Sequence, residues 1–146
     1  MKNDNILNLM VNHHALLEAL FVLFRDEAKE KSPRTGATLG EFAWETKKHF
    51  FAEESAIFDY LPMESYGMLE VINQLKDEHI EMLSQLKKFA ANLDELKDED
   101  VESFSKLLEA HRKIEEINLY PKLDKELRDG QKVQIISRIN EIPIHE

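Results

Sequence analysis

The chain has 146 residues, 42% of them hydrophobic, and this length suits a single compact domain spanning residues 1–146. It has no cysteine, which excludes disulfides, thiolate metal sites and cysteine nucleophiles, so any bound metal needs nitrogen and oxygen ligands. A formal net charge of -10 disfavours nucleic acid and anionic lipid as partners. We read no bilayer-spanning apolar run and no signal peptide, and we therefore expect a cytoplasmic protein without a membrane partner.

Apolar residues recur at spacings of three and four along most of the chain, and the few glycines and prolines divide this pattern into segments. Pro121 lies inside the fourth segment, where we expect a kink or a local break. No stretch alternates as a strand does. The predicted fold is therefore all-α, an antiparallel up-down four-helix bundle with a short C-terminal fifth helix. The expected helices cover about Asn3 to Lys31, Thr38 to Leu61, Met68 to Leu93, Val101 to Arg128, and Val133 to Ile142.

Histidines occur in all four long predicted helices, and two of these helices share a motif. His49 precedes Glu53 by four residues, and His111 precedes Glu115 by the same step. Four residues correspond to about 6 Å along a helix and keep both side chains on one face, so each pair can reach a common metal centre. The two motifs together predict a metal site in the bundle interior.

The other two helices each supply one further histidine. His79 is followed by apolar residues at +3, +4 and +7, and His13 is followed by apolar residues at the same offsets. Adjacent helical residues point about 100° apart, so only one of His13 and His14 can face the core. We favour His13, because Glu18 at +4 from His14 indicates an exposed face, and we keep His14 as the alternative.

Four imidazoles and two carboxylates suit two iron ions. Each iron would take two histidines, the two glutamates would bridge the pair together with an oxo or hydroxo group, and positions would remain open for an exogenous ligand. We assign no catalytic residue. The adjacent Glu54 and Glu116 are interpreted as solvated or supporting carboxylates, and the three tyrosines as candidate hydrogen-bond donors. The predicted metal ligands are His13, His49, Glu53, His79, His111 and Glu115, with His14 as the alternative to His13.

From about Asn5 to Leu127 these residues resemble the hemerythrin-like family, also called the HHE cation-binding domain. Oxygen-carrying hemerythrins use five histidines, one glutamate and one aspartate. Here Leu83 stands where their additional third-helix histidine would be, and Glu115 and Glu116 stand where their fourth-helix aspartate would be. The sequence is thus more similar to the subgroup with four histidines and two glutamates, which includes iron-sensing domains and iron-centre repair proteins.

This resemblance implies a non-haem di-iron protein whose centre binds or responds to O2, NO or peroxide, for sensing, scavenging or redox buffering. One alternative is iron storage, donation or repair of iron-sulfur centres, which predicts readily released metal. Another is oxidase or peroxidase activity, for which the sequence indicates no substrate pocket. The last is a metal-free helical interaction module. The expected partner is a small diatomic or peroxide ligand, and the protein is expected to be a monomer or a homodimer.

Overall fold

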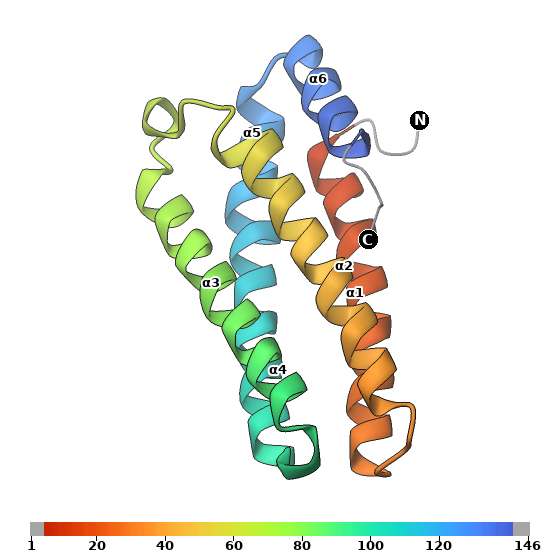
Figure 1. The fold of residues 1–146 in the computed structure, drawn as a ribbon. Helices are drawn as coiled ribbons and strands as arrows, with labels where there is room; N and C mark the ends of the chain where they lie inside the picture. Colours follow the sequence, from red (N-terminus) through yellow and green to blue (C-terminus); the bar gives the residue numbers. More distant parts are fainter. Residues whose placement is uncertain (1–4, 142–146) are drawn as a thin grey trace.

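The computed structural model of the protein describes residues 5–141, and every regular element in that range is helical. This confirms the all-α prediction. Long helices lie side by side, and the connections between consecutive helices alternate between the two ends of the molecule (Figure 1). These helices are α1 (Ile6–Lys29), α2 (Thr35–Glu53), α3 (Leu69–Ala91) and α4 (Asp98–Lys113).

Shorter helical elements continue or join the long ones. Two of them are π-helical: η1 (Glu54–Phe58) extends α2, and η4 (Ile114–Leu119) joins α4 to α5 (Tyr120–Glu126). The local break expected near Pro121 is thus a π-helical segment just before it, and the proline lies in the first turn of α5, where its missing N–H leaves no hydrogen bond unmade. The 3-10 turns η2 (Met63–Tyr66) and η3 (Leu93–Glu95) lie in the connections before α3 and α4.

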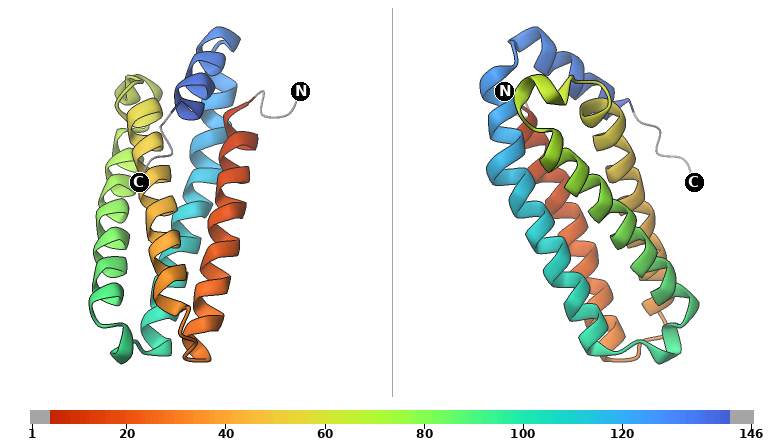
Figure 2. Two further views of the ribbon diagram at one scale, coloured as in Figure 1. Left: turned by 45° about the vertical axis from the view of Figure 1, so that its right-hand side comes forward. Right: turned by 90° about the vertical axis from the view of Figure 1, so that its left-hand side faces the viewer.

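The predicted fifth helix is α6 (Asp129–Asn140), which folds back over one end of the bundle and contacts α1, α2 and η1 (Figure 2). Its expected end at Ile142, and the expected start of the first helix at Asn3, fall outside the described residues. The start of α1 is held by α5, because both carboxylate oxygens of Asp124 accept hydrogen bonds from the free backbone N–H groups of Ile6 and Leu7, at 2.8 and 3.0 Å.

The apolar core has two parts. One lies toward α6 and gathers the first turns of α1 with η1, α5 and α6, including Met10, Ile57 and Tyr120. The other lies toward the opposite end and is rich in phenylalanine, including Phe21 and Phe104 with ring centroids 5.6 Å apart. Along each long helix, the residues of one cluster stop about where those of the other begin. The histidines and glutamates of the predicted site fall at these junctions.

Helix α1 corrects one reading of the sequence. From the sequence we expect no apolar run long enough to span a bilayer. By length and composition alone, however, α1 is long and apolar enough to cross a membrane. This is weak evidence, since core helices and N-terminal signal sequences meet the same criterion. In the structure α1 buries Leu17, Phe21 and Phe24 in the core, and Leu16 and Leu23 remain exposed.

Candidate metal centre

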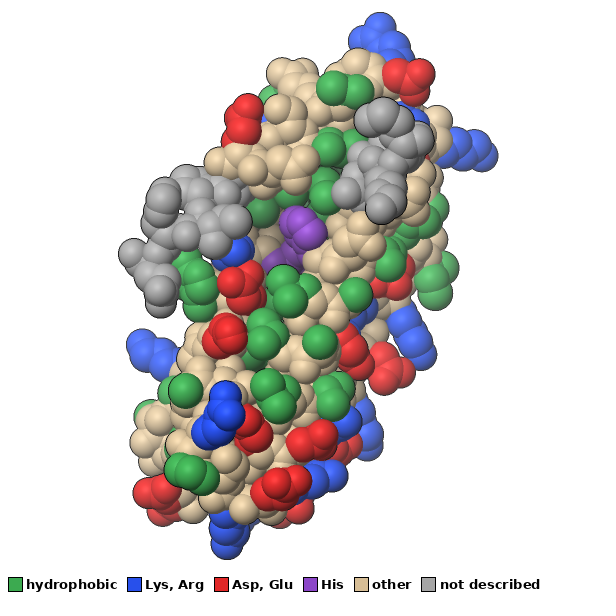
Figure 3. All heavy atoms as spheres, turned by 90° about the vertical axis from the view of Figure 1, so that its right-hand side faces the viewer, with side chains coloured by type: hydrophobic (Ala, Val, Ile, Leu, Met, Phe, Trp, Pro, Cys, Tyr) green, Lys and Arg blue, Asp and Glu red, His purple; other side chains and the backbone are tan. Residues whose placement is uncertain are grey.

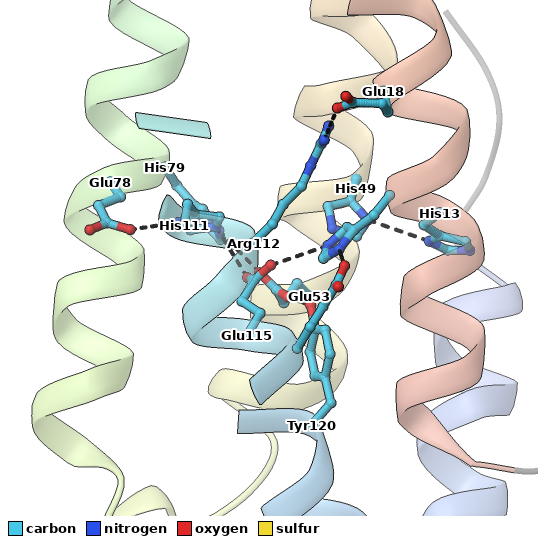
Figure 4. Close-up of polar contacts among 12 residues, drawn as sticks. His13, Glu18, His49, Glu53, Glu78, His79, His111, Arg112, Glu115 and Tyr120 are labelled. Carbon is cyan, nitrogen blue, oxygen red and sulfur yellow. Dashed lines mark hydrogen bonds and ion pairs between the residues drawn. The ribbon is translucent and has the colours of Figure 1, made fainter. Parts of the chain in front are cut away.

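A layer of buried histidines and glutamates separates the two apolar clusters. Its members come from α1, α2, α3, α4 and η4, and none has more than 5% of its surface exposed. The close-up view shows the side chains of the labelled members, His49, Glu53, His79, His111 and Glu115, converging between the helices (Figure 4). The layer consists of His14, His49, Glu53, His79, His111 and Glu115.

The atoms of this layer form two groups, each compact enough to hold a metal ion. In one group Glu53, His79, His111 and Glu115 offer ligand atoms within 4.8 Å of one another. In the other, His14 and His49 do so with Glu115, which belongs to both groups. The structure therefore places two histidines in each group and one shared carboxylate between them.

Inside the layer, imidazole Nε2 atoms approach carboxylate oxygens. His79 Nε2 lies 3.0 Å from Glu53 Oε1, His14 Nε2 lies 3.2 Å from Glu115 Oε1, and His111 Nε2 lies 3.1 Å from Glu115 Oε2. The first two contacts are reciprocal: each joins a histidine of the first helix in one helical hairpin to the glutamate motif of the other hairpin. The two hairpins are α1–α2 and α3–α4.

The structure places His14, not the favoured His13, in the layer. His14 is 5% exposed and belongs to a metal-sized group, whereas His13 is half-buried and belongs to neither group. The offsets explain the difference. The residues buried after His79 lie at +3 and +7, and the same offsets from His14 lead to the buried Leu17 and Phe21. Leu16, which supported His13, is 53% exposed.

Carboxylates contact the outer nitrogens of three of the four histidines. Glu116 Oε2 lies 2.5 Å from His14 Nδ1, and Glu54 Oε2 lies 2.6 Å from His79 Nδ1. Of the two interpretations that the sequence leaves open for Glu54 and Glu116, solvated or supporting carboxylates, these contacts agree with the second. Glu78 Oε1 lies 2.7 Å from His111 Nδ1, a contact that sequence reasoning missed. Such partners fix which imidazole nitrogen carries the proton and leave Nε2 free to bind a metal.

Consecutive glutamates serve one site where the two π-helical segments begin or run. Glu53 ends α2 and Glu54 begins η1, while Glu115 and Glu116 both lie within η4. Glu53 is fully buried in the layer, whereas the side chain of Glu54 is 35% exposed and reaches the outer nitrogen of a histidine. π-helical turns are rare in proteins, and those that occur are frequently found at functional sites.

A family model for the hemerythrin HHE cation-binding domain matches residues 5–123, most of the chain. The chain belongs to this family. No curated protein and no solved structure matches it. Membership of the hemerythrin HHE family and the buried histidine and glutamate cluster together fit a metal-binding protein.

Unpaired polar atoms test whether this hemerythrin-family layer suits a cation. Buried polar atoms nearly always have hydrogen-bond partners. In the described part of the chain, most of the buried side-chain nitrogen and oxygen atoms that lack a hydrogen-bond partner belong to this layer. Those in the layer are all imidazole nitrogens or carboxylate oxygens, which are ligand atoms for iron and similar metals. They are Nε2 of His49, His79 and His111, Oε1 of Glu53, and both carboxylate oxygens of Glu115.

The glutamates of the hemerythrin-family layer have opposite pKa shifts. Burial raises the pKa of Glu53, and the negative charge of Glu115 raises it further. Burial also disfavours the charged form of Glu115, but the charge of His111, together with the close contacts of Glu53, His111 and His14, outweighs burial and holds that pKa well below the usual range. Glu115 is therefore the carboxylate that is ionised before any metal binds.

The pKa values of the histidines also shift in opposite directions. Burial lowers the pKa of His49 well below its usual value, with Glu53 opposing the change. Burial acts on His111 too, but the charge and the close contact of Glu115 outweigh burial and raise the pKa of His111 to about 9. The pKa of His14 is raised for the same reason. Without metal, His111 thus holds a proton beside Glu115 at neutral pH, and a bound metal ion would replace it.

Aromatic side chains enclose the layer. The Phe50 ring stacks on His79, with centroids 3.8 Å apart and an interplanar angle of 9°. Tyr120, fully buried, donates a hydrogen bond from its hydroxyl to Glu53 Oε2, and burial raises its pKa well above the usual value. Of the three tyrosines singled out in the sequence, Tyr120 is the one at the site. Tyr60 is 37% exposed and contacts Arg138 instead.

Proposed function

We propose that the chain is a non-haem di-iron protein whose centre binds O2, NO or peroxide. One iron would be held by His79 and His111, the other by His14 and His49, with Glu115 and Glu53 contributing carboxylates and an oxo or hydroxo group completing the bridge. The proposal takes the four long helices as an antiparallel up-down bundle. It requires neither a membrane nor nucleic acid, and it suits a cytoplasmic monomer or homodimer.

The observation that carries the proposal is the direction of the unpaired atoms. Four histidines from four helices approach one space with Nε2, and outer partners hold Nδ1 of at least three of them. An interaction module would gain little from a core layer whose imidazole nitrogens and carboxylate oxygens make no hydrogen bonds, because a buried polar atom without a partner costs about 1–3 kcal/mol. A metal pair would satisfy them.

The six side chains do not fill two six-coordinate irons, which supports binding of an exogenous ligand. When bound, the iron pair would supply open coordination positions and exchange between Fe2+ and Fe3+. The chain's own residues perform the remaining tasks. Glu54, Glu78 and Glu116 orient imidazoles, Phe50 excludes water from one side of His79, and Tyr120 holds a hydroxyl proton beside Glu53.

Burial favours retention of metal over iron donation. The side chains of His79 and His111 are 2% exposed, and that of Glu53 is 0% exposed. A donating site has to release its metal to a partner, which is slow when every ligand is enclosed. Ligand binding at a retained centre is therefore the function that we place first, ahead of storage or repair of iron-sulfur centres.

The test is metal analysis of anaerobically loaded protein together with its visible spectrum. We expect two irons per chain, an oxo-to-iron absorption band that bleaches on reduction, and a new spectrum when the reduced protein meets O2 or NO. The matched variants are Glu115→Gln, which alters the shared carboxylate, and Glu109→Gln, an exposed glutamate of α4 outside the layer. Glu115→Gln should lose iron, and Glu109→Gln should keep it.

Three results would redirect the proposal. Substoichiometric iron that loading does not improve would return the protein to the metal-free module. Two irons with an unchanged spectrum after addition of O2, NO and peroxide would refute ligand binding while leaving the centre intact. Rapid transfer of iron to a chelator would favour iron handling.

A further inference from the structure

Around the histidine layer, one outer nitrogen differs from the rest. His14, His79 and His111 each meet a carboxylate at 2.5–2.7 Å. His49 Nδ1 instead lies 3.4 Å from Nδ1 of His13, a half-buried neighbour. Glu78 and His13 occupy equivalent positions in the two hairpins, because Glu78 directly precedes His79 and His13 directly precedes His14. One hairpin thus has a histidine where the other has a carboxylate.

This exception coincides with a recess of about 240 Å³ between α1, α2 and α6, lined by His13 and His49. A space-filling view shows histidine side chains at the bottom of a hollow among hydrophobic side chains (Figure 3). The close-up view places His49 between His13 and the glutamates of the layer (Figure 4). The apolar wall of the recess is formed by Leu16, Leu17, Ala52 and Ile139.

Charge at the recess is balanced. Its two charged residues, Glu45 and Lys48, form an ion pair at 2.9 Å with each other. A small uncharged molecule can therefore enter without displacing a carboxylate from a histidine. Neutral apolar molecules also favour apolar walls over water.

A second cavity reaches the layer, but its chemistry is different. The space of about 450 Å³ between α1 and α4 is lined by His14, Glu116 and Arg112. The ion pair of Arg112 with Glu18 joins α4 to α1, and Glu116 is bonded to the outer nitrogen of His14. Entry there would separate charged partners in a partly desolvated setting, which costs more than turning the His13 ring away from its 3.4 Å contact with His49.

We propose that the recess between α1, α2 and α6 is the route by which small uncharged ligands, such as O2 and NO, reach the centre, and that His13 is its gate. The inference rests on the proposed function. His13 belongs to neither metal-sized group but contacts His49, a member of one of them, and rotation of its side chain away from His49 would open the path. Exposed side chains change rotamer in picoseconds to nanoseconds. Rotation of His13 is therefore not the slow step of ligand entry, and the fraction of time that the ring is turned aside sets the rate of passage.

The kinetic test uses NO binding to the reduced, iron-loaded protein by stopped-flow absorbance. Leu16→Trp fills the mouth from an exposed position, and Leu23→Trp places the same ring on an exposed position of α1 outside the recess. Leu16→Trp should lower the association and dissociation rates together by about tenfold, an added barrier of about 1.4 kcal/mol, with Kd unchanged. His13→Ala should raise both rates. Leu23→Trp should change neither.

A second measurement needs no metal. Xenon, a neutral apolar probe of ligand size, is added under pressure to metal-free protein, and amide NMR shifts are recorded. Shifts at Ala52 and Ile139 that disappear in Leu16→Trp support the recess as an apolar entry. Absence of shifts there, or NO rates unchanged by Leu16→Trp, overturns the route.

The two proposals fail in different ways. Protein that binds two irons but none of O2, NO and peroxide refutes the proposed function, and the route falls with it even where xenon enters the recess. Protein that binds NO at equal rates in wild type and Leu16→Trp keeps the proposed function and refutes the route alone. A change in Kd with an unchanged association rate in His13→Ala would make His13 a positioning residue for His49 and not a gate.

Discussion

Removing the metal should make the stability of this protein fall with rising pH between about 6.5 and 9. In the folded chain Glu115 raises the pKa of His111 to about 9, against burial, whereas an unfolded chain has a histidine pKa near 6.5. Below pH 6.5 both states hold the proton, and the pair contributes fully. As pH rises toward 9 the unfolded state loses its proton first, so the contribution is lost. At 1.36 kcal/mol per pH unit, the total is about 3 kcal/mol.

The assay is urea denaturation of chelator-treated protein at several values between pH 6.5 and 9.5, with the ring of His111 titrated in parallel by NMR. The free energy of unfolding should decline across this window, and His111→Gln should flatten the decline. Iron-loaded protein should lack the decline, because a metal on Nε2 replaces the proton. A metal-free free energy that is constant or rises with pH would refute the charge pairing of His111 with Glu115.

Three further predictions concern single side chains. His14→Ala should remove iron from the purified protein, whereas His13→Ala should retain it, as measured by metal analysis; equal loss in both would contradict the placement of His14. Glu78→Gln should weaken iron binding by about 10–100-fold in chelator competition, because an outer carboxylate orients its imidazole, and unchanged affinity would make that contact dispensable. Tyr120→Phe should lower the free energy of unfolding by about 1–3 kcal/mol, since Glu53 loses a buried donor; an unchanged urea midpoint would argue against the bond.

The helices could be predicted because apolar spacing and loop residues are local signals. The expected segment from Thr38 to Leu61 corresponds to α2 and η1, and the fifth helix corresponds to α6. The π-helical character of η1 and η4 could not be predicted, since a shift of the hydrogen-bond step by one residue leaves no mark in composition. It is decided by packing of the whole bundle.

The candidate metal site could be predicted in part from the sequence. Two His-x-x-x-Glu motifs and a third-helix histidine identified His49, His79 and His111 as members of one layer, together with Glu53 and Glu115. The choice between adjacent histidines failed because both faces of α1 carry leucines, and apolar residues are not always buried. Glu78 gave no signal, since its partner is a helix away and only the fold brings them together.

The reciprocal contacts between the two hairpins have a consequence for assembly. Each hairpin supplies one histidine from its first helix and one His-x-x-x-Glu-Glu motif from its second, and its motif contacts the histidine of the other hairpin: Glu53 and Glu54 reach His79, while Glu115 and Glu116 reach His14. Two identical hairpins related by a two-fold axis would produce the same contacts. Half of a centre lies in each half of the chain, and a cut in the connection between α2 and α3 leaves fragments that iron should hold together.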